Sequence, residues 1–283
     1  MKRTLFLALL LLPLAVLAIG YANAVRDPVV RRGTVTVRGW PADRPPVHVV
    51  LVSDIHVAGP DMPPARLARI VGQINALAPD LVLIAGDLIS DKALRTRSYT
   101  FAEALVPLRA LRAPALAVLG NHDHWRNGAA ARAALSGAGV TLLENRVVRR
   151  RGLTIAGIDD IYAGRPDTRL FDRPLPGPVL LLTHSPEVVR LLPRGERLVV
   201  AGHTHCGQIV LPVIGPLGSL QNGKRGGLAC GVVHRKGRVF VVTAGLGTSI
   251  VPLRYGAPPD LWLLSVRPAA PAPGRADARR QAR

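Results

Sequence analysis

The chain of 283 residues is long enough for one large domain or two small ones with a sizeable core. With 48% hydrophobic residues and few aromatic ones, its composition is that of a globular protein and excludes a wholly disordered chain. The formal net charge of +19 would attract phosphate, nucleic acid or anionic lipid. However, the excess is made of scattered arginines without interleaved aromatic residues, which disfavours nucleic acid as a partner.

The N-terminal segment, residues 1–25, has the pattern of a signal peptide or a membrane anchor. Two basic residues precede an apolar run over Leu5–Ile19. The small-x-small triplet at residues 22–24 matches a signal-peptidase site, whereas the uncharged stretch read through to Val25 is just long enough to cross a bilayer. Both alternatives stay open, with a slight preference for the anchor. Either one makes the membrane a partner and places the rest of the chain on the periplasmic or extracytoplasmic side.

Composition also separates the folded region from its flanks. Residues 26–46 are charged and contain prolines, which predicts a linker with one short strand at Thr34–Arg38. Residues 268–283 are rich in proline, alanine and arginine without apolar periodicity, which indicates a disordered basic tail. The intervening residues 47–267 are predicted to form one domain.

In the first half of this domain, apolar runs alternate with helical patterns. Prolines at positions 63 and 64 open a helix whose apolar side chains recur at helical spacing. This alternation of strand and helix implies parallel strands with helices packed on them. The predicted strands are His48–Val52, Leu81–Ala85 and Ala115–Leu119, and the other predicted helices are Tyr99–Leu111 and one near Ala129–Leu135.

In the second half, strands predominate and one short helix is predicted near Glu187–Leu192. A hairpin turn is expected at residues 235–237, where Lys and Gly follow Arg. The predicted strands are Leu153–Gly157, Val179–Thr183, Leu198–Ala201, Val232–His234, Val239–Thr243 and Leu261–Val266. The fold class is therefore α/β, with two β-sheets packed face to face and flanked by helices.

Polar residues follow five of these apolar strands at the point where each strand ends. The carboxyl ends of strands in α/β sheets form the ligand crevice, so we expect these side chains to gather at one place. Imidazole and carboxylate ligands together suit Zn, Mn or Fe, and seven ligands fit two ions that share a carboxylate. The residues concerned are Asp54, His56, Asp87, Asn121, His184, His203 and His205, with His122 and Asp123 beside them.

The order of these residues resembles a known family, the calcineurin-like metallophosphoesterases. The motifs D-x-H, G-D, G-N-H-[DE], H and G-H-x-H run complete from Asp54 to His205. Gln208, the run Gly245–Ser249 and Arg254 are similar to the membrane-associated bacterial branch of that family. The resemblance implies a four-layer α-β-β-α sandwich of two mixed β-sheets and a dinuclear site of two divalent ions, Mn, Zn or Fe.

The resemblance also implies a role for each site residue. His122 would face the substrate, and Asp123 would orient His122 by a hydrogen bond. Asp87 would bridge the two ions. The first ion would be held by Asp54, His56, Asp87 and His205, and the second by Asp87, Asn121, His184 and His203.

The implied activity is hydrolysis of a phosphodiester or pyrophosphate bond by a metal-bridging hydroxide, with His122 donating a proton or hydrogen bond to the leaving oxygen. The substrate is predicted to be a phosphoester, lipid-linked or a nucleotide. No substrate-binding residue and no protein partner is predicted. Two alternatives are retained: an exported nuclease, favoured by the basic charge alone, and a non-catalytic metal-stabilised binding module.

Several other residues receive structural predictions. Cys206, where the branch usually has glycine, is expected to be a small buried apolar residue; the alternatives are an oxidisable site or a disulfide with Cys230. The pair at residues 159–160 is expected to have a turn role, and the alternative is a position near the cleft. Arg254 is predicted to have one of two roles. It binds a phosphate or a lipid headgroup, or it forms a surface salt bridge. His48, His124 and His234 are predicted to lie outside the site.

Overall fold

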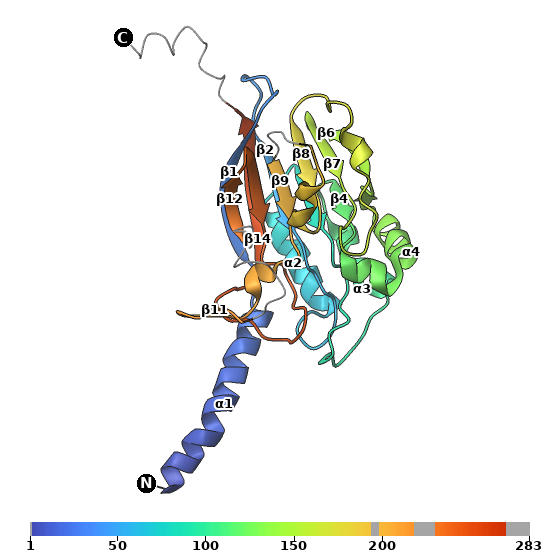
Figure 1. Cartoon of the computed structure of the whole chain (residues 1–283). Helices are drawn as coiled ribbons and strands as arrows, with labels where there is room; N and C mark the ends of the chain where they lie inside the picture. The colour runs from blue at the N-terminus through green and yellow to red at the C-terminus, as the bar shows by residue number, and fades with distance from the viewer. Residues whose placement is uncertain (1, 194–197, 218–229, 270–283) are drawn as a thin grey trace, which may run out of the picture.

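The structure is a computed structural model that describes residues 2–193, 198–217 and 230–269, with side chains from residue 11 onwards (Figure 1). Residues 270–283 of the predicted tail lie outside the described residues. Within these described residues, the body of the protein consists of two six-stranded sheets and a small two-stranded one, with helices packed on them.

The first sheet has the order β1-β14-β2-β3-β4-β5. Its strands β2 to β5 are parallel, and β14 lies antiparallel to β2 and parallel to β1. The bounds are β1 Val29–Val37, β14 Asp260–Pro268, β2 Val47–Val52, β3 Leu81–Ala85, β4 Ala115–Val118 and β5 Thr141–Leu142.

The second sheet has the order β12-β13-β9-β8-β7-β6. Its four central strands are parallel and each edge strand is antiparallel to its neighbour. The bounds are β12 Gly231–Arg235, β13 Arg238–Val242, β9 Leu198–Ala201, β8 Val179–Leu182, β7 Leu153–Gly157 and β6 Arg146–Arg150. The small sheet pairs β10 (Val210–Leu211) with β11 (Gly215–Pro216). The mixed two-sheet architecture predicted from the sequence is therefore confirmed.

Three apolar clusters hold the layers together. The central cluster joins the facing sides of the two sheets, for example Leu51 and Leu83 with Ile155 and Val200. A second cluster lies under the helices of the first sheet, α2 (Pro64–Ala76), α3 (Phe101–Ala104) and α4 (Asn121–Gly137). A third covers the outer face of the second sheet, where the helices are the short 3₁₀ turns η2 (Thr168–Phe171) and η3 (Pro186–Arg190).

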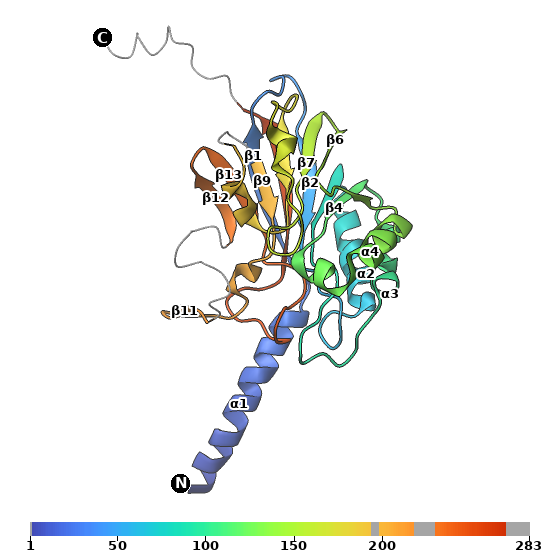
Figure 2. The same cartoon turned by 45° about the vertical axis from the view of Figure 1, so that its right-hand side comes forward.

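The first helix, α1 (Lys2–Val25), projects from the body in both views (Figures 1 and 2). Its C-terminal part is attached to the body: the backbone N–H of Arg254 donates to the carbonyl of Gly20 at 2.9 Å, and the Tyr255 ring packs against that glycine. Its apolar side chains from Leu11 to Ile19 are largely exposed. Within the described part of the chain, no helix combines the length and apolarity needed to cross a membrane.

Several boundaries differ from the predictions for physical reasons. Strand β1 pairs with β14 over nine positions, so residues 29–37 of the predicted linker pack into the domain. The helix expected over Tyr99–Leu111 is divided into α3 and a 3₁₀ turn, η1 (Val106–Ala110), which has a proline near its start. Strand β6 was missed because its sequence, RVVRR, is that of a charged edge strand.

The hairpin expected at residues 235–237 is confirmed. Arg235 pairs with Arg238 across the β12–β13 ladder. The two residues between them, Lys236 and Gly237, have φ angles of 51° and 72°, as a two-residue hairpin loop with right-handed strand twist requires.

Candidate metal centre

The ends of five strands, from both sheets, meet at one edge of the sandwich. The residues that follow β2, β3, β8 and β9, together with the first residues of α4 after β4, line this edge. Five of the predicted ligands adopt the left-handed backbone region that non-glycine residues avoid, and such strain is typical of functional sites. Their φ angles are 47° at Asp54, 48° at His56, 55° at Asp87, 70° at His203 and 49° at His205.

Glycines in the motifs let these loops come close. A Cβ atom at Gly120 would collide with the carboxylate of Asp87, and one at Gly202 would collide with the carboxylate of Asp54. No larger residue fits at either position without moving a predicted ligand. These glycines are therefore needed because they let the strand ends approach each other closely, and not only because they permit tight turns.

The first group of ligand atoms comes from β2, β3 and β9. Nε2 of His56 and Nε2 of His205 lie 3.2 Å apart. The Oδ1 atom of Asp54 lies 3.3 Å from His205 Nε2, and Oδ2 of Asp87 lies 3.4 Å from His56 Nε2. All four side chains are buried.

The second group comes from β3, β8, β9 and α4. Oδ1 of Asn121 lies 3.1 Å from both Nε2 of His184 and Nδ1 of His203, and these two nitrogens are themselves 3.1 Å apart. Oδ2 of Asp87 lies 3.3 Å from His184 Nε2. The same carboxylate oxygen thus touches both groups, which is the arrangement of a bridging ligand.

These spacings fit metal ions. Ligands bound to one ion at about 2.0–2.2 Å lie roughly 3–3.5 Å apart, and the convergent nitrogen and oxygen atoms have this separation. Nδ1 of His184 lies 2.7 Å from the carbonyl oxygen of Ala85, so that a donated Nδ1–H leaves the lone pair of Nε2 directed into the site. The donor set of imidazole, carboxylate and amide is suited to borderline divalent ions such as Zn, Mn or Fe.

Burial and neighbouring charges set the protonation states that such ions need. Burial lowers the pKa of His56 and of His205 well below the ordinary value, and the Arg254 guanidinium adds to the effect on His205. Burial alone would raise the pKa of Asp87, but His184 and His56 hold it well below its usual range. Burial alone would lower the pKa of His184, but the charge of Asp87 raises it well above the ordinary value. A metal ion must therefore displace a proton from His184 in order to bind there.

His122 lies beside the ligands on the first turn of α4. Its backbone N–H donates to Oδ1 of Asp87 at 3.0 Å, and its ring stands edge-on to that of His56, with centroids 5.1 Å apart. Its Nδ1 lies 2.7 Å from Oδ1 of Asp91, a residue of the loop after β3 that the sequence analysis did not single out. This contact is a close approach of charge and not a hydrogen bond, since Nδ1 of His122 has no hydrogen-bond partner among the described residues.

Asp123 has a different set of partners. Its Oδ2 accepts the backbone N–H groups of Asp87 and Gly120, both at 2.9 Å, and its Oδ1 accepts that of Leu88 at 2.8 Å. Burial and the charge of Asp87 raise its pKa to about 7, against the effect of these donors. Asp123 therefore holds the loop after β3 to the start of α4, and the hydrogen bond predicted between Asp123 and His122 is not among these contacts.

Both roles predicted for Arg254, a phosphate contact and a surface salt bridge, are wrong. Its side chain is fully buried and donates to the carbonyl oxygens of Gly247, Ala244 and Ala257 at 2.6–2.8 Å. One of its nitrogens lies 3.3 Å from Nδ1 of His205. Arg254 thus fixes the 244–257 loop behind a predicted ligand, and Gly245 and Gly247 of that loop pack closely against Asp54 and His56.

The predicted role of Cys206 as a small apolar residue is also wrong, since Cys206 forms a disulfide with Cys230, 24 residues away. The disulfide was one of the alternatives that the sequence left open. It ties the turn that carries His205 to the start of β12.

Outside the centre, the other structural predictions can be compared with the fold. Asp159 and Asp160 accept backbone N–H groups of the following turn, as predicted, and Asp159 also lies 2.7 Å from His124 Nε2. His48 and His234 are on strands, away from the ligands. The structure therefore separates these residues from the group of predicted metal ligands.

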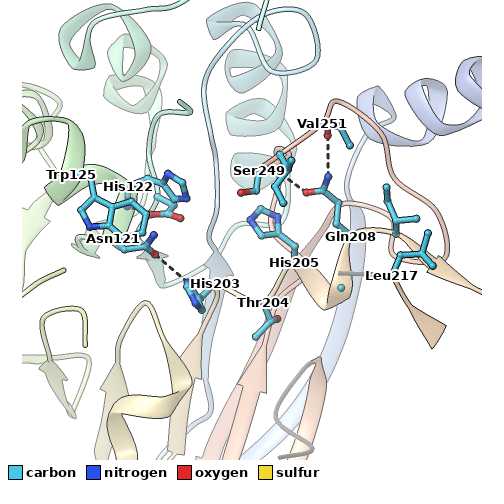
Figure 3. Close-up of a pocket in the computed structure, with 14 residues that line it drawn as sticks. Asn121, His122, Trp125, His203, Thr204, His205, Gln208, Leu217, Ser249 and Val251 are labelled. Atoms are coloured by element: carbon cyan, nitrogen blue, oxygen red, sulfur yellow. Dashed lines mark hydrogen bonds between the residues drawn. The ribbon is translucent and has the colours of Figure 1, made fainter. Parts of the chain in front are cut away.

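A cavity of about 540 Å³ opens beside the ligands (Figure 3). His122 and Trp125 are on one side of it, Gln208 and Leu217 are on the other, and His205 lies between them (Figure 3). Its size suits a small substrate bound next to the metal ligands.

Comparison with known proteins agrees with this geometry. Residues 47–207 match the calcineurin-like phosphoesterase family. The chain is 32% identical over 219 residues to the uncharacterized metallophosphoesterase YkuE of Bacillus subtilis (strain 168), covering 71% of this chain and 72% of that protein. It is 31% identical over 277 residues to a transmembrane protein with metallophosphoesterase domain of Danio rerio, covering 90% of this chain but 61% of that protein.

Two solved structures resemble the fold at lower identity. The 5'-nucleotidase precursor of Thermus thermophilus is 16% identical with a TM-score of 0.39, covering 71% of this chain and 49% of its own. The nuclease MPE of Pseudomonas putida is 20% identical with a TM-score of 0.38, and the match covers 80% of this chain and 90% of that chain.

Proposed function

The chain belongs to the calcineurin-like phosphoesterase family, a family of phosphoric ester hydrolases, and we propose that it cleaves a phosphodiester or pyrophosphate bond with two divalent metal ions. The observation that carries this proposal is the position of Asp87. One oxygen of its carboxylate lies 3.4 Å from His56 and 3.3 Å from His184, which belong to the two ligand groups.

Two divalent ions, when bound, supply activation of a water nucleophile and neutralisation of phosphate charge. We assign the first ion to Asp54, His56, Asp87 and His205, and the second to Asp87, Asn121, His184 and His203. Their identity among Mn, Zn and Fe stays open, because the donor set suits all three.

The remaining side chains of the centre act on the substrate and on geometry. His122 is half-buried at the cavity and is the group we propose to donate a proton or hydrogen bond to the leaving oxygen. The carboxylate of Asp91, 2.7 Å from Nδ1 of His122, would act on His122 through its charge and favour the protonated ring. Asp123 would act on the site by position, since it fixes the backbone of Asp87.

The substrate is proposed to be a phosphoester that is either lipid-linked or a nucleotide. A nuclease activity is the second candidate, supported by the formal charge of +19. A metal-stabilised binding module is the third, and it would bind the ions without turnover.

We further propose that the domain works outside the cytoplasm, close to a membrane, with α1 as its leader or anchor. The disulfide Cys206–Cys230 supports this proposal because such bonds persist in oxidising compartments. The exposed apolar side chains of α1 support it as well. The mass of the mature N-terminus tests it: loss of residues 1–24 indicates a leader, an intact chain in the membrane fraction indicates an anchor, and an intact chain in the cytoplasm excludes both.

The activity is tested with Mn²⁺-loaded protein on bis(p-nitrophenyl) phosphate, p-nitrophenyl phosphate and single-stranded DNA. We expect hydrolysis of the diester that requires metal and that falls at least 100-fold in Asp87→Asn. The matched control is Asp80→Asn, an acid that pairs with His48 on the surface. Loaded protein that hydrolyses none of the substrates would defeat the proposal and leave the binding module, whereas a preference for DNA that weakens with salt would favour the nuclease.

A further inference from the structure

Five large apolar side chains form part of the wall of the cavity beside the metal ligands. The apolar lining includes Ile209, Leu217, Ile250, Val251 and Trp125, and Leu217 and Val251 lie on the side opposite Trp125 (Figure 3). Leu217, Ile250 and Trp125 are each more than half exposed. Large apolar side chains gathered around one opening are costly in water and mark a surface that meets an apolar ligand.

Gln208 is the largest polar side chain in this part of the wall, and its amide already forms hydrogen bonds with the backbone. The amide nitrogen of Gln208 donates to the carbonyl oxygens of Val251 and Leu253, at 2.9 and 3.2 Å. Its amide oxygen accepts the backbone N–H of Ser249 at 2.9 Å. Gln208 therefore braces the apolar loop instead of offering its amide to a ligand, and a nucleobase would find no amide partner at this position.

The apolar wall begins next to the group proposed as the acid. Trp125 lies one turn after His122 on α4, and the two rings stand edge-on with centroids 5.0 Å apart. A phosphate held by the metal ligands would therefore have its ester chain directed between Trp125 and the opposite wall of the cavity (Figure 3).

The same wall is joined to the projecting helix. Val210 donates its backbone N–H to the carbonyl of Tyr255, and the ring of Tyr255 packs against Gly20 of α1. Beyond this contact, α1 carries exposed apolar side chains. The short strand β11, next to the lining residue Leu217, and the helix α1 lie at one end of the molecule (Figures 1 and 2).

We infer that the cavity holds an aliphatic chain, so that the substrate is a phosphoester of a lipid-like alcohol and not of a nucleoside. This inference rests on the proposed function, and it decides between the two substrate classes left open there. The phosphate lies at the metal ligands and the chain lies against Ile209, Leu217, Ile250 and Trp125.

Calorimetry on the Mn²⁺-loaded full chain tests this inference without turnover. The probes are methyl, butyl and octyl phosphate, below their aggregation limits, and thymidine 5'-monophosphate. Each buried methylene should tighten binding by up to about fourfold. We expect octyl phosphate to bind at least 100-fold tighter than methyl phosphate, and the nucleotide to bind no tighter than butyl phosphate. Equal affinities across the series, or a nucleotide that binds tighter than octyl phosphate, would overturn the inference.

Two variants test where the aliphatic chain of the ligand binds. Ile250→Ser and Leu217→Ser should each weaken octyl phosphate about tenfold and leave methyl phosphate unchanged. The control is Val106→Ser, an exposed apolar residue outside the cavity, which should change neither. Octyl binding that is insensitive to both cavity variants would overturn the assignment. Diester turnover without chain-length dependence refutes this inference alone, whereas chain-dependent binding without turnover of any ester refutes the proposed function.

Discussion

The substitution Asp123→Asn separates a positioning role from a chemical one. In the native protein, one oxygen of Asp123 accepts the N–H groups of Asp87 and Gly120 and the other accepts that of Leu88. If the asparagine places its carbonyl oxygen where it accepts the N–H groups of Asp87 and Gly120, its amide N–H₂ group faces the N–H of Leu88. Because Leu88 is fully buried, water cannot replace the lost acceptor.

The cost follows from this geometry. One buried N–H loses its partner and faces another donor, which costs about 1–3 kcal/mol. Burial raises the pKa of Asp123 to about 7, so its charge does not stabilise the fold near neutral pH and the loss of that charge does not add to this cost. We therefore expect a loss of about 2 kcal/mol in the free energy of unfolding, or roughly 4–8 °C in Tm.

The comparison variant is Asp91→Asn. Asp91 is partly exposed and contacts His122, so its loss should leave Tm nearly unchanged and lower kcat by about 10–100-fold. Thermal unfolding and diester turnover are measured on both variants. An Asp123→Asn protein with native Tm but little turnover would refute the positioning role and restore the chemical role first predicted for Asp123.

Three further predictions concern other parts of the centre. His122→Ala should bind metal as the wild type does and lose about 10²–10⁴-fold in kcat; unchanged turnover would remove His122 from the mechanism. Replacing Cys206 and Cys230 together by serine should lower stability by about 3 kcal/mol, and an unchanged denaturant midpoint would contradict the disulfide. Because Asp87 raises the pKa of His184, protons should compete with metal there. Mn²⁺ affinity measured by titration should therefore fall from about pH 8 to about pH 6, and a constant affinity would count against His184 as a ligand.

The features that the sequence predicts best are those with short-range causes. The central strands, from Leu81–Ala85 to Leu198–Ala201, were predicted because buried parallel strands are continuous apolar runs. The ligand group could be predicted because each member directly follows such a strand. Edge strands such as β6 have no apolar run, and β1 receives its stability from pairing with β14, more than two hundred residues away in the chain.

The side-chain partners in the site depend on tertiary geometry that no local pattern contains. Asp123 follows His122 directly, but on the first turn of α4 its carboxylate is directed back to backbone N–H groups. Asp91 reaches His122 only because the loop after β3 folds over it. In the same way, Arg254 looks like a surface cation in the sequence, and its burial follows from four backbone carbonyl oxygens around it.

Electron paramagnetic resonance of the Mn²⁺-loaded protein tests most directly whether Asp87 bridges two ions. At saturation we expect two Mn²⁺ per chain and the broadened spectrum of an exchange-coupled pair, which Asp87→Asn should convert to that of isolated ions. A six-line spectrum of one magnetically isolated Mn²⁺ in the saturated wild type would contradict the dinuclear site.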